Sequence, residues 1–229
     1  MYNLVIKRFL DFFLSLIGIL VLAFPMLCVA IVTKIDSPGP AFFRQKRVGR
    51  GKRPFYLLKF RSMSVSAPKD VPTHRLQNAT ELMTPWQRFM RKYSIDELPQ
   101  LLSVLSGKMS IVGPRPALEN QTDLIAERDR YRANDVRPGL TGLAQISGRD
   151  RLTLKEKARL DGEYVAALRA GSLRGLAIDA RCFFGTFGAV LRSDGVVEGA
   201  TEESIKETQN TEGEQMSESA ETQEKNKAL

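Results

Sequence analysis

The chain has 229 residues and a formal charge of +8, which favours a single domain or one domain with an appendage. Two cysteines are too few to hold a disulfide-rich secreted domain together. The single histidine argues against His-based zinc chemistry and against a Ser-His-Asp triad.

The positive charge is concentrated before residue 198. Residues 198–229 contain nine Glu and three Lys, so this segment carries −6 and the preceding part of the chain carries +14. The segment has no aromatic residue and no apolar periodicity, which predicts a disordered acidic tail. A body this basic favours nucleic acid, anionic lipid or phosphorylated small molecules as partners. Nucleic acid is the weakest of these, because the basic residues form no recognisable reading module.

The N-terminal segment predicts a membrane helix. After Lys7 and Arg8, the run from Phe12 to Thr33 carries no charge over 22 residues. As one straight helix it is about 33 Å long, enough to cross a bilayer. A cleaved signal peptide is disfavoured, because the run is too long and Lys34 follows it instead of a cleavage site.

Three features favour a helix that enters the bilayer, bends and returns. Pro25 lies inside the run, where it removes a backbone hydrogen bond. Basic residues flank the run on both sides, so neither end is favoured outside the cytoplasm. Asp11 lies one turn after Lys7 and Arg8, where it can pair with either near the headgroups. A Pro-kinked single span is the alternative, and the residues alone weigh the two about equally.

A β-hairpin is predicted next. Residues 41–48 and 54–63 resemble strands around a turn at Gly49–Lys52. The alternation of a strand places Lys59 and Arg61 on one face. They either bind an anion or form a solvated edge, and the residues do not decide between these.

A polar loop at 64–83 precedes an amphipathic helix. Thr84 is predicted as its N-cap, with Pro85 at the first helical position and Gln87 completing a capping box. One stripe of this helix is apolar, which suits either a membrane surface or, more commonly, packing on a core. The stripe consists of Trp86, Phe89, Met90 and Tyr93.

Asp96 and Glu97 are the candidate catalytic pair. Pro99 is best placed at the start of a helix over 99–106, so both carboxylates lie just outside a helix N-terminus, where phosphate is also attracted. Two carboxylates at an anion site make electrostatic sense only with a cation, most simply Mg²⁺ shared with substrate phosphates. The pattern therefore suggests phosphoryl chemistry.

A short apolar strand then ends in the rigid turn Gly113-Pro114-Arg115-Pro116. Two prolines fix the backbone that presents Arg115, which suits bidentate phosphate binding, although such turns also carry solvent-facing arginines. Residues 117–135 are predicted as a charged helix.

Residues 136–149 contain three glycines, a proline and two arginines. Such a stretch allows backbone amides to approach a ligand closely. Arg137, Gln145 and Arg149 are the candidate substrate-binding residues within it.

Together these motifs resemble the bacterial sugar transferase family, the monotopic phosphoglycosyl transferases that start glycan assembly on a lipid carrier. The resemblance covers about residues 2–194 and matches the minimal catalytic form, because the multi-span N-terminal extension of larger members is absent. It rests on the N-terminal pattern with Pro25 and on residues 59–63, 94–101, 109–116 and 137–149.

The resemblance implies a reaction. A UDP-sugar donates its phosphosugar to polyprenol (undecaprenyl) phosphate and UMP is released, with Asp96 as the nucleophile of an aspartyl-phosphosugar intermediate. Asp96 and Glu97 would hold Mg²⁺, and Arg115 would bind phosphate, with Lys59 and Arg61 as weaker candidates. Cations must offset the diphosphate charge before a carboxylate can approach it. This is the first membrane step of exopolysaccharide, capsule, O-antigen or glycoprotein glycan synthesis.

The resemblance also implies an α+β architecture at the bacterial inner membrane. Residues 1–35 would form a re-entrant helix with Lys7, Arg8, Asp11 and Pro25 as its membrane-related residues. Residues 36–197 would form a cytoplasmic catalytic domain with interfacial helices and a short hairpin, and residues 198–229 the acidic tail. The bilayer and downstream glycosyltransferases would be partners, and nucleic acid would not.

The sequence departs from the family pattern in one place. Residues 161–164 match an Asp-x-x-Tyr element, but residues 166–179 are longer than usual, which leaves Asp179 without an assigned role. The main alternative function is a non-catalytic, membrane-anchored scaffold or anionic-lipid-binding protein, which would gain nothing from Asp96 and Glu97. A nucleic-acid-binding protein would require a dispensable apolar N-terminus. The residues do not identify the sugar.

Overall fold

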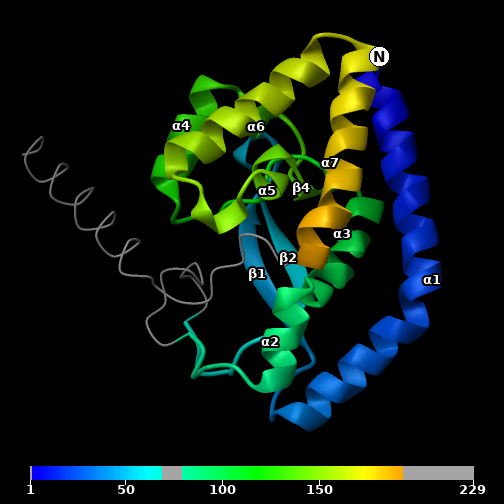
Figure 1. The fold of residues 1–229 in the computed structure, drawn as a ribbon, viewed down its shortest axis with the longest axis vertical. Coiled ribbons are helices and arrows are strands. Elements are labelled where there is room, and N and C mark those ends of the chain that lie inside the picture. Colours follow the sequence, from blue (N-terminus) through cyan, green and yellow to red (C-terminus); the bar gives the residue numbers. More distant parts are fainter. Residues whose placement is uncertain (1, 69–78, 193–229) are drawn as a thin grey trace, which may run out of the picture. The chain divides into compact units, whose positions relative to one another are not determined.

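A long helix, two small sheets and a layer of shorter helices make up the fold (Figure 1). The computed structural model describes residues 2–68 and 79–192. The α-helices are α1 (Lys7–Asp36), α2 (Pro85–Lys92), α3 (Leu101–Leu105), α4 (Thr122–Arg130), α5 (Leu143–Ile146), α6 (Leu154–Arg169) and α7 (Ser172–Arg192). The strands are β1 (Phe42–Val48), β2 (Pro54–Phe60), β3 (Ser110–Val112) and β4 (Gly139–Thr141). The mixture of helices with small sheets confirms the α+β class.

Helix α1 has an inverted distribution of polar and apolar residues. Its buried residues are all polar, namely Lys7, Asp11, Ser15 and Thr33. Large apolar side chains such as Val21 and Phe24 are instead 68% and 75% exposed. By length and composition α1 qualifies as a membrane-spanning helix. Because water would not favour such a surface, the outer face of α1 indicates membrane association.

Pro25 bends α1 without ending it. The chain remains helical from Lys7 to Asp36, so the expected helix-break-helix is corrected to one continuous helix. Figure 1 shows the change of direction in its second half. Proline removes one intrahelical hydrogen bond and crowds the preceding turn, which bends a helix but leaves the remaining bonds intact.

The predicted hairpin is confirmed. Strands β1 and β2 pair antiparallel, with Phe43 opposite Lys59, and a short 3₁₀ turn joins them. Strand β2 ends at Phe60, so Arg61 lies just beyond the sheet. Leu57 is buried, which anchors the hairpin on the core.

The capping box of α2 is also confirmed. Thr84 accepts from the Gln87 amide, and the Gln87 side chain accepts from the Thr84 amide. Of the predicted apolar stripe, Met90 is buried while Phe89 is 45% exposed. Trp86 donates its indole N–H to Thr33 of α1. Helix α2 therefore packs against the C-terminal part of α1 and leaves part of its apolar face uncovered.

Two of the three glycines in residues 136–149 lie against the backbone of Gly113. A Cβ added to Gly139 would lie 2.1 Å from the Gly113 nitrogen, and one added to Gly142 would lie 2.1 Å from the Gly113 oxygen. The glycines therefore let parallel strands β3 and β4 approach each other. Gly139 and Gly142 thus bring two backbones together.

Two predicted helices are shorter than expected. The predicted 117–135 helix is α4 over Thr122–Arg130, because Ala117 and Leu118 pair with the edge of β1 and Arg132 adopts a left-handed conformation. The predicted 99–106 helix is a 3₁₀ segment, Ile95–Gln100, followed by α3.

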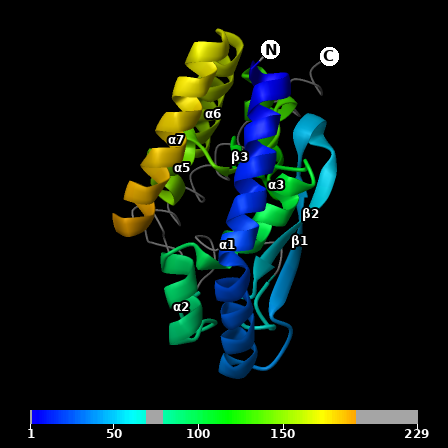
Figure 2. The same ribbon diagram turned by 90° about the vertical axis from the view of Figure 1, so that its right-hand side faces the viewer.

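A buried polar network centred on Asp179 ties α1 to α6 and α7. Lys7 donates to Asp179 at 2.7 Å, and the hydroxyls of Tyr2 and Tyr164 donate to the same carboxylate at 2.6 and 2.8 Å. Burial, followed by the Asp179 carboxylate, raises the pKa of both tyrosines, so both remain protonated donors. The residue left without a role by sequence is thus the anchor of the N-terminal helix. Figure 2 shows α7 beside the upper part of α1.

Of the two predicted domain boundaries, at residues 35 and 197, the structure describes only the first. Helix α1 ends one residue beyond the predicted boundary at 35. The predicted boundary at 197 and the acidic tail 198–229 lie outside the described residues.

Candidate active site

Asp96 and Glu97 lie on the 3₁₀ segment between α2 and α3. Ser94, in the left-handed conformation, ends the preceding helix and turns the chain into this segment. Both carboxylates are buried, at 4% and 7% exposure. A buried carboxylate is costly unless it is paired or hydrogen-bonded, so the surroundings of each decide its chemistry.

Glu97 is held by two cations from different parts of the chain. Lys59 of β2 donates to Oε1 at 2.9 Å, and Arg115 of the Gly-Pro-Arg-Pro turn donates to the same oxygen at 2.7 Å. Burial alone would raise the pKa of Glu97, but Arg115 and Lys59 outweigh it and hold that pKa well below its usual range. The structure therefore brings together three predicted site residues, with Glu97 as a permanent anion between them.

Asp96 has a different environment. Its Oδ2 accepts a hydrogen bond from the Ser62 hydroxyl at 3.0 Å. Burial raises the pKa of Asp96, and the charges of Lys59 and Arg91 oppose this rise. Neighbouring carboxylates whose environments separate their pKa values commonly have distinct chemical roles. Asp96 makes fewer hydrogen bonds than Glu97, and its Oδ1 accepts none from residues 2–68 or 79–192.

The backbone of Arg115 is held in place by a residue of a buried ion pair. Arg128 of α4 donates to Asp161 of α6 at 2.6 Å and also donates to the Arg115 carbonyl at 2.9 Å. On the other side of the turn, Arg47 donates to the Pro116 carbonyl at 3.0 Å. Burial and the neighbouring Arg115 charge lower the pKa of Arg47 to about 9. The turn is thus fixed on both sides, and Arg47 adds positive charge near it.

Sequence reasoning missed several of these residues. Ser62 was within the recognised Lys-Phe-Arg-Ser-Met segment, so its motif pointed to it. Asp161 carries a sequence signal only as the first residue of the Asp-x-x-Tyr element. Arg47, Arg91 and Arg128 carried no local signal, because their roles arise only when distant segments meet.

Four predicted substrate-binding residues lie outside the carboxylate cluster. Arg61 donates to the carbonyls of Pro38, Pro40, Thr33 and Ser37, so it holds the end of α1 and its assignment to phosphate is not supported. The Arg61 guanidinium therefore donates its hydrogen bonds to backbone carbonyls.

Arg137, Gln145 and Arg149 each contact a different part of the chain. Arg137 donates to the Gly107 carbonyl, and Gln145 donates to the Leu140 carbonyl. Arg149 donates to the Ser94 hydroxyl at 3.3 Å, next to the segment that carries Asp96. Of these residues, Arg149 alone contacts that segment in the hydrogen bonds found among the described residues.

Asp11 is also placed differently from the expectation. Its side chain is 4% exposed and accepts hydrogen bonds from the Ser110 hydroxyl and the Ile111 amide of β3. Arg8 donates to the carbonyls of Val104 and Leu105. A carboxylate that would be costly in lipid is thus satisfied by the folded body.

The residues present fit Mg²⁺ through Asp96 better than through Glu97. No group of three or more carboxylate, histidine or cysteine side chains gathers as a metal site within the described ranges. Magnesium commonly uses one or two carboxylates and completes its shell with water and substrate phosphates. Glu97 Oε1 already accepts from two cations, whereas Asp96 retains an oxygen. The expected metal role of Glu97 is therefore not supported by this arrangement.

Comparison with known proteins gives a consistent result. The family model described as bacterial sugar transferase matches residues 2–193. A UDP-glucose:undecaprenyl-phosphate glucose-1-phosphate transferase of Xanthomonas campestris pv. campestris is 39% identical over 171 residues, covering 72% of this chain and 35% of that protein.

Two further relatives differ in length. The uncharacterized sugar transferase EpsL of Bacillus subtilis is 38% identical over 162 residues, covering 71% of this chain and 78% of that protein. The galactosyl transferase CpsE of Streptococcus agalactiae is 40% identical over 177 residues, covering 71% of this chain and 38% of that protein. The chain thus spans little more than a third of the length of the Xanthomonas and Streptococcus proteins.

Proposed function

This chain belongs to the bacterial sugar transferase family, and we propose that it transfers a phosphosugar from a UDP-sugar to undecaprenyl phosphate with release of UMP. The observation that carries this proposal is the pair of buried carboxylates with opposite environments. Glu97 is fixed between Lys59 and Arg115, while Asp96 keeps an oxygen available. A protein that only binds anions has no use for Asp96.

The reaction has two displacements at one phosphorus. In the first, an Asp96 oxygen attacks the phosphorus that bears the sugar, the bond to the bridging oxygen breaks, and UMP leaves with the electron pair. In the second, an oxygen of undecaprenyl phosphate attacks the aspartyl-phosphosugar, which frees the Asp96 carboxylate and forms the polyprenyl diphosphosugar. Covalent catalysis replaces one difficult transfer with two easier ones.

The cations explain how a carboxylate can approach a diphosphate. Lys59 and Arg115 are fixed by Glu97, and Arg47 lies beside the same turn. Groups fixed in advance stabilise charge in the transition state without reorganising. A bound Mg²⁺ would supply Lewis-acid stabilisation of the phosphates; Asp96 would hold it through one carboxylate oxygen and attack the phosphorus with the other.

We also propose that α1 is re-entrant at the bacterial inner membrane, with the folded body on the cytoplasmic face. Both ends of α1 are attached to the same body: Lys7 to Asp179 of α7, and the carbonyls of Thr33 and Ser37 to Arg61 after β2. One folded body cannot occupy both sides of a bilayer. The bend at Pro25 allows the helix to enter and return.

Topology has a direct test. Val5→Cys and Ile35→Cys, each in a Cys28→Ser background, place a thiol at an exposed position near each end of α1. In sealed vesicles, an impermeant maleimide should label both from the cytoplasmic side only. Labelling of the two positions from opposite sides would contradict the re-entrant arrangement.

The chemistry is tested with Asp96→Asn. The variant should lose turnover because an amide cannot act as the nucleophile, and it should keep donor binding because shape is preserved. Intact-mass analysis of the unchanged protein with donor alone should show a phosphosugar adduct that the variant lacks. Asp123→Asn, which alters an exposed carboxylate of α4, is the matched control and should form the adduct.

The donor should be chosen from a panel. The names of the relatives mention glucose in one case and a galactosyl group in another, so UDP-glucose, UDP-galactose and their N-acetylated counterparts all belong in a UMP-release assay.

Full activity of Asp96→Asn would reject the covalent mechanism. Vesicle binding without UMP release from any donor would favour the alternative, a non-catalytic lipid-binding protein.

A further inference from the structure

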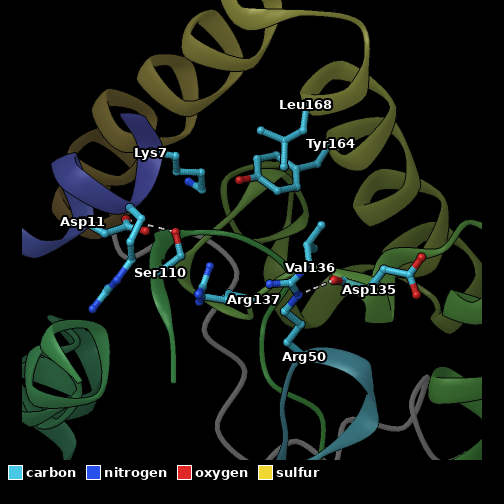
Figure 3. A pocket seen from close by; sticks show the side chains of 10 residues that line it. Lys7, Asp11, Arg50, Ser110, Asp135, Val136, Arg137, Tyr164 and Leu168 are labelled. Atoms are coloured by element: carbon cyan, nitrogen blue, oxygen red, sulfur yellow. Dashed lines mark hydrogen bonds between the residues drawn. The ribbon is translucent and has the colours of Figure 1, made fainter. Parts of the chain in front are cut away.

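A second basic site lies at the N-terminal end of α1. A pocket there is lined by four cationic side chains, Lys7, Arg8, Arg50 and Arg137, and by two carboxylates, Asp11 and Asp135. In Figure 3, Lys7 and Tyr164 lie on one side of the pocket, and Arg50 and Arg137 lie on the other. The charged residues come from α1, from the hairpin turn and from the segment before β4.

This pocket is separate from Asp96 and Glu97. Arg137 is bonded to Gly107, which follows α3, whereas the two carboxylates precede α3. The lining of the pocket includes none of Lys59, Asp96, Glu97 and Arg115.

The negative charges of the pocket are already used elsewhere. The Asp135 carboxylate pairs with Arg132 and Arg169, on a side chain that points away from the pocket in Figure 3. The Asp11 carboxylate accepts from Ser110 and from the Ile111 amide.

Lys7 is the only one of the four cations with an ion-pair partner among residues 2–68 and 79–192, namely Asp179. Arg8, Arg50 and Arg137 donate only to backbone carbonyls within the same ranges.

Three guanidinium groups therefore line the pocket without an ion-pair partner among residues 2–68 and 79–192, and Asp11 is the carboxylate whose charge acts on Arg137. Burial lowers the pKa of Arg137, the charges of Arg50 and Arg8 lower it further, and the charge of Asp11 opposes this. Each guanidinium has N–H groups beyond those bonded to carbonyls, since arginine carries five donors. Such a group of donors suits a tetrahedral oxyanion, because guanidinium binds phosphate oxygens in a fixed geometry.

We propose that the pocket formed by Arg8, Arg50 and Arg137 binds a phosphate group, separately from the catalytic carboxylates. The phosphate has two possible sources with the same chemistry. One is the headgroup of an anionic phospholipid, because Arg8 lies one turn before the uncharged part of α1. The other is a soluble phosphate or nucleotide.

The variants follow from the exposure of each arginine. Arg50→Gln alters an exposed side chain in the hairpin turn with one hydrogen bond, to the Asp135 carbonyl, so its effect on folding is small. Arg137→Gln is the second variant. Arg53→Gln is the matched control, because Arg53 is exposed near the same turn and does not line the pocket.

The first measurement is a calorimetric titration of the full chain in neutral detergent with inorganic phosphate. Arg50→Gln and Arg137→Gln should each weaken one binding site about tenfold, as expected for the loss of a charge-assisted hydrogen bond, while Arg53→Gln leaves it unchanged. Equal phosphate binding by all four proteins would overturn the proposal. Since the readout is binding, its failure would leave the proposed transferase reaction untouched.

The second measurement identifies the source. The same proteins are floated with phosphatidylcholine vesicles that contain or lack phosphatidylglycerol. A preference for phosphatidylglycerol that Arg50→Gln reduces more than Arg53→Gln does would assign the pocket to a lipid headgroup. Equal reductions, together with weakened phosphate binding, would assign it to a soluble phosphate.

Discussion

Removing the buried ion pair between Arg128 and Asp161 should affect the stability of the protein and the position of Arg115 to different extents. Arg128 and Asp161 have side chains 6% and 2% exposed and approach to 2.6 Å. Asp161→Asn leaves a buried guanidinium without its counter-charge, which costs about 3–5 kcal/mol. For a domain of this size, each kcal/mol lowers the melting temperature by about 2–4 °C, so a fall of about 6–20 °C is expected.

Arg128→Met should be destabilising by a similar amount, because it leaves Asp161 buried and unpaired and also removes the donor to the Arg115 carbonyl. Arg128→Met combined with Asp161→Leu removes both charges. The double variant should cost only about 1–3 kcal/mol, mainly for the unsatisfied carbonyl. The two single effects should therefore be strongly non-additive.

Activity should follow a different pattern from stability. Both Arg128→Met and the double variant leave the Arg115 carbonyl without its donor, so both should release UMP more slowly at a temperature where all variants are folded. Thermal unfolding in detergent measures the first effect, and initial rates of UMP release measure the second. Single changes that each cost less than about 1 kcal/mol and simply add would refute this account of the pair.

Two other substitutions test the fold, and a truncation tests the acidic tail. Lys7→Met should destabilise the protein by about 3 kcal/mol in thermal unfolding, because Asp179 loses its buried cation, and a wild-type melting temperature would contradict this role. Gly139→Ala should prevent folding or cost about 3 kcal/mol or more, because its Cβ would meet the Gly113 backbone at 2.1 Å, and circular dichroism would show the loss. Truncation after Gly199 should leave UMP release nearly unchanged, since the sequence predicts no core residues there; a severalfold loss would reject an inert tail.

Local signals predicted local structure well. The Thr84 capping box and the hairpin turn depend on residues close in sequence, and both occur as expected. Residue type alone points to Lys59 and Glu97, and the structure joins them in an ion pair.

The errors arose where a residue's partner is distant in the chain. Arg61 looked like a phosphate ligand because it alternates with Lys59, yet the strand ends before it and its donors meet the end of α1. Asp11 looked like a headgroup residue, yet its partners are about 100 positions away in β3. Sequence spacing cannot show such contacts, because any solvated carboxylate or guanidinium has the same local pattern.

The position of β3 connects the membrane helix to the catalytic turn. This three-residue strand pairs with β4 on one side only, so its other edge has backbone groups that need partners. Asp11 of α1 accepts from the Ile111 amide on that edge, and Tyr164 of α6 donates to the Val112 carbonyl. Three residues later the same segment presents Arg115 to Glu97. The side chain that fixes α1 against the body therefore also fixes the strand that leads to the Gly-Pro-Arg-Pro turn, so a change in the position of α1 has a direct physical route to Arg115.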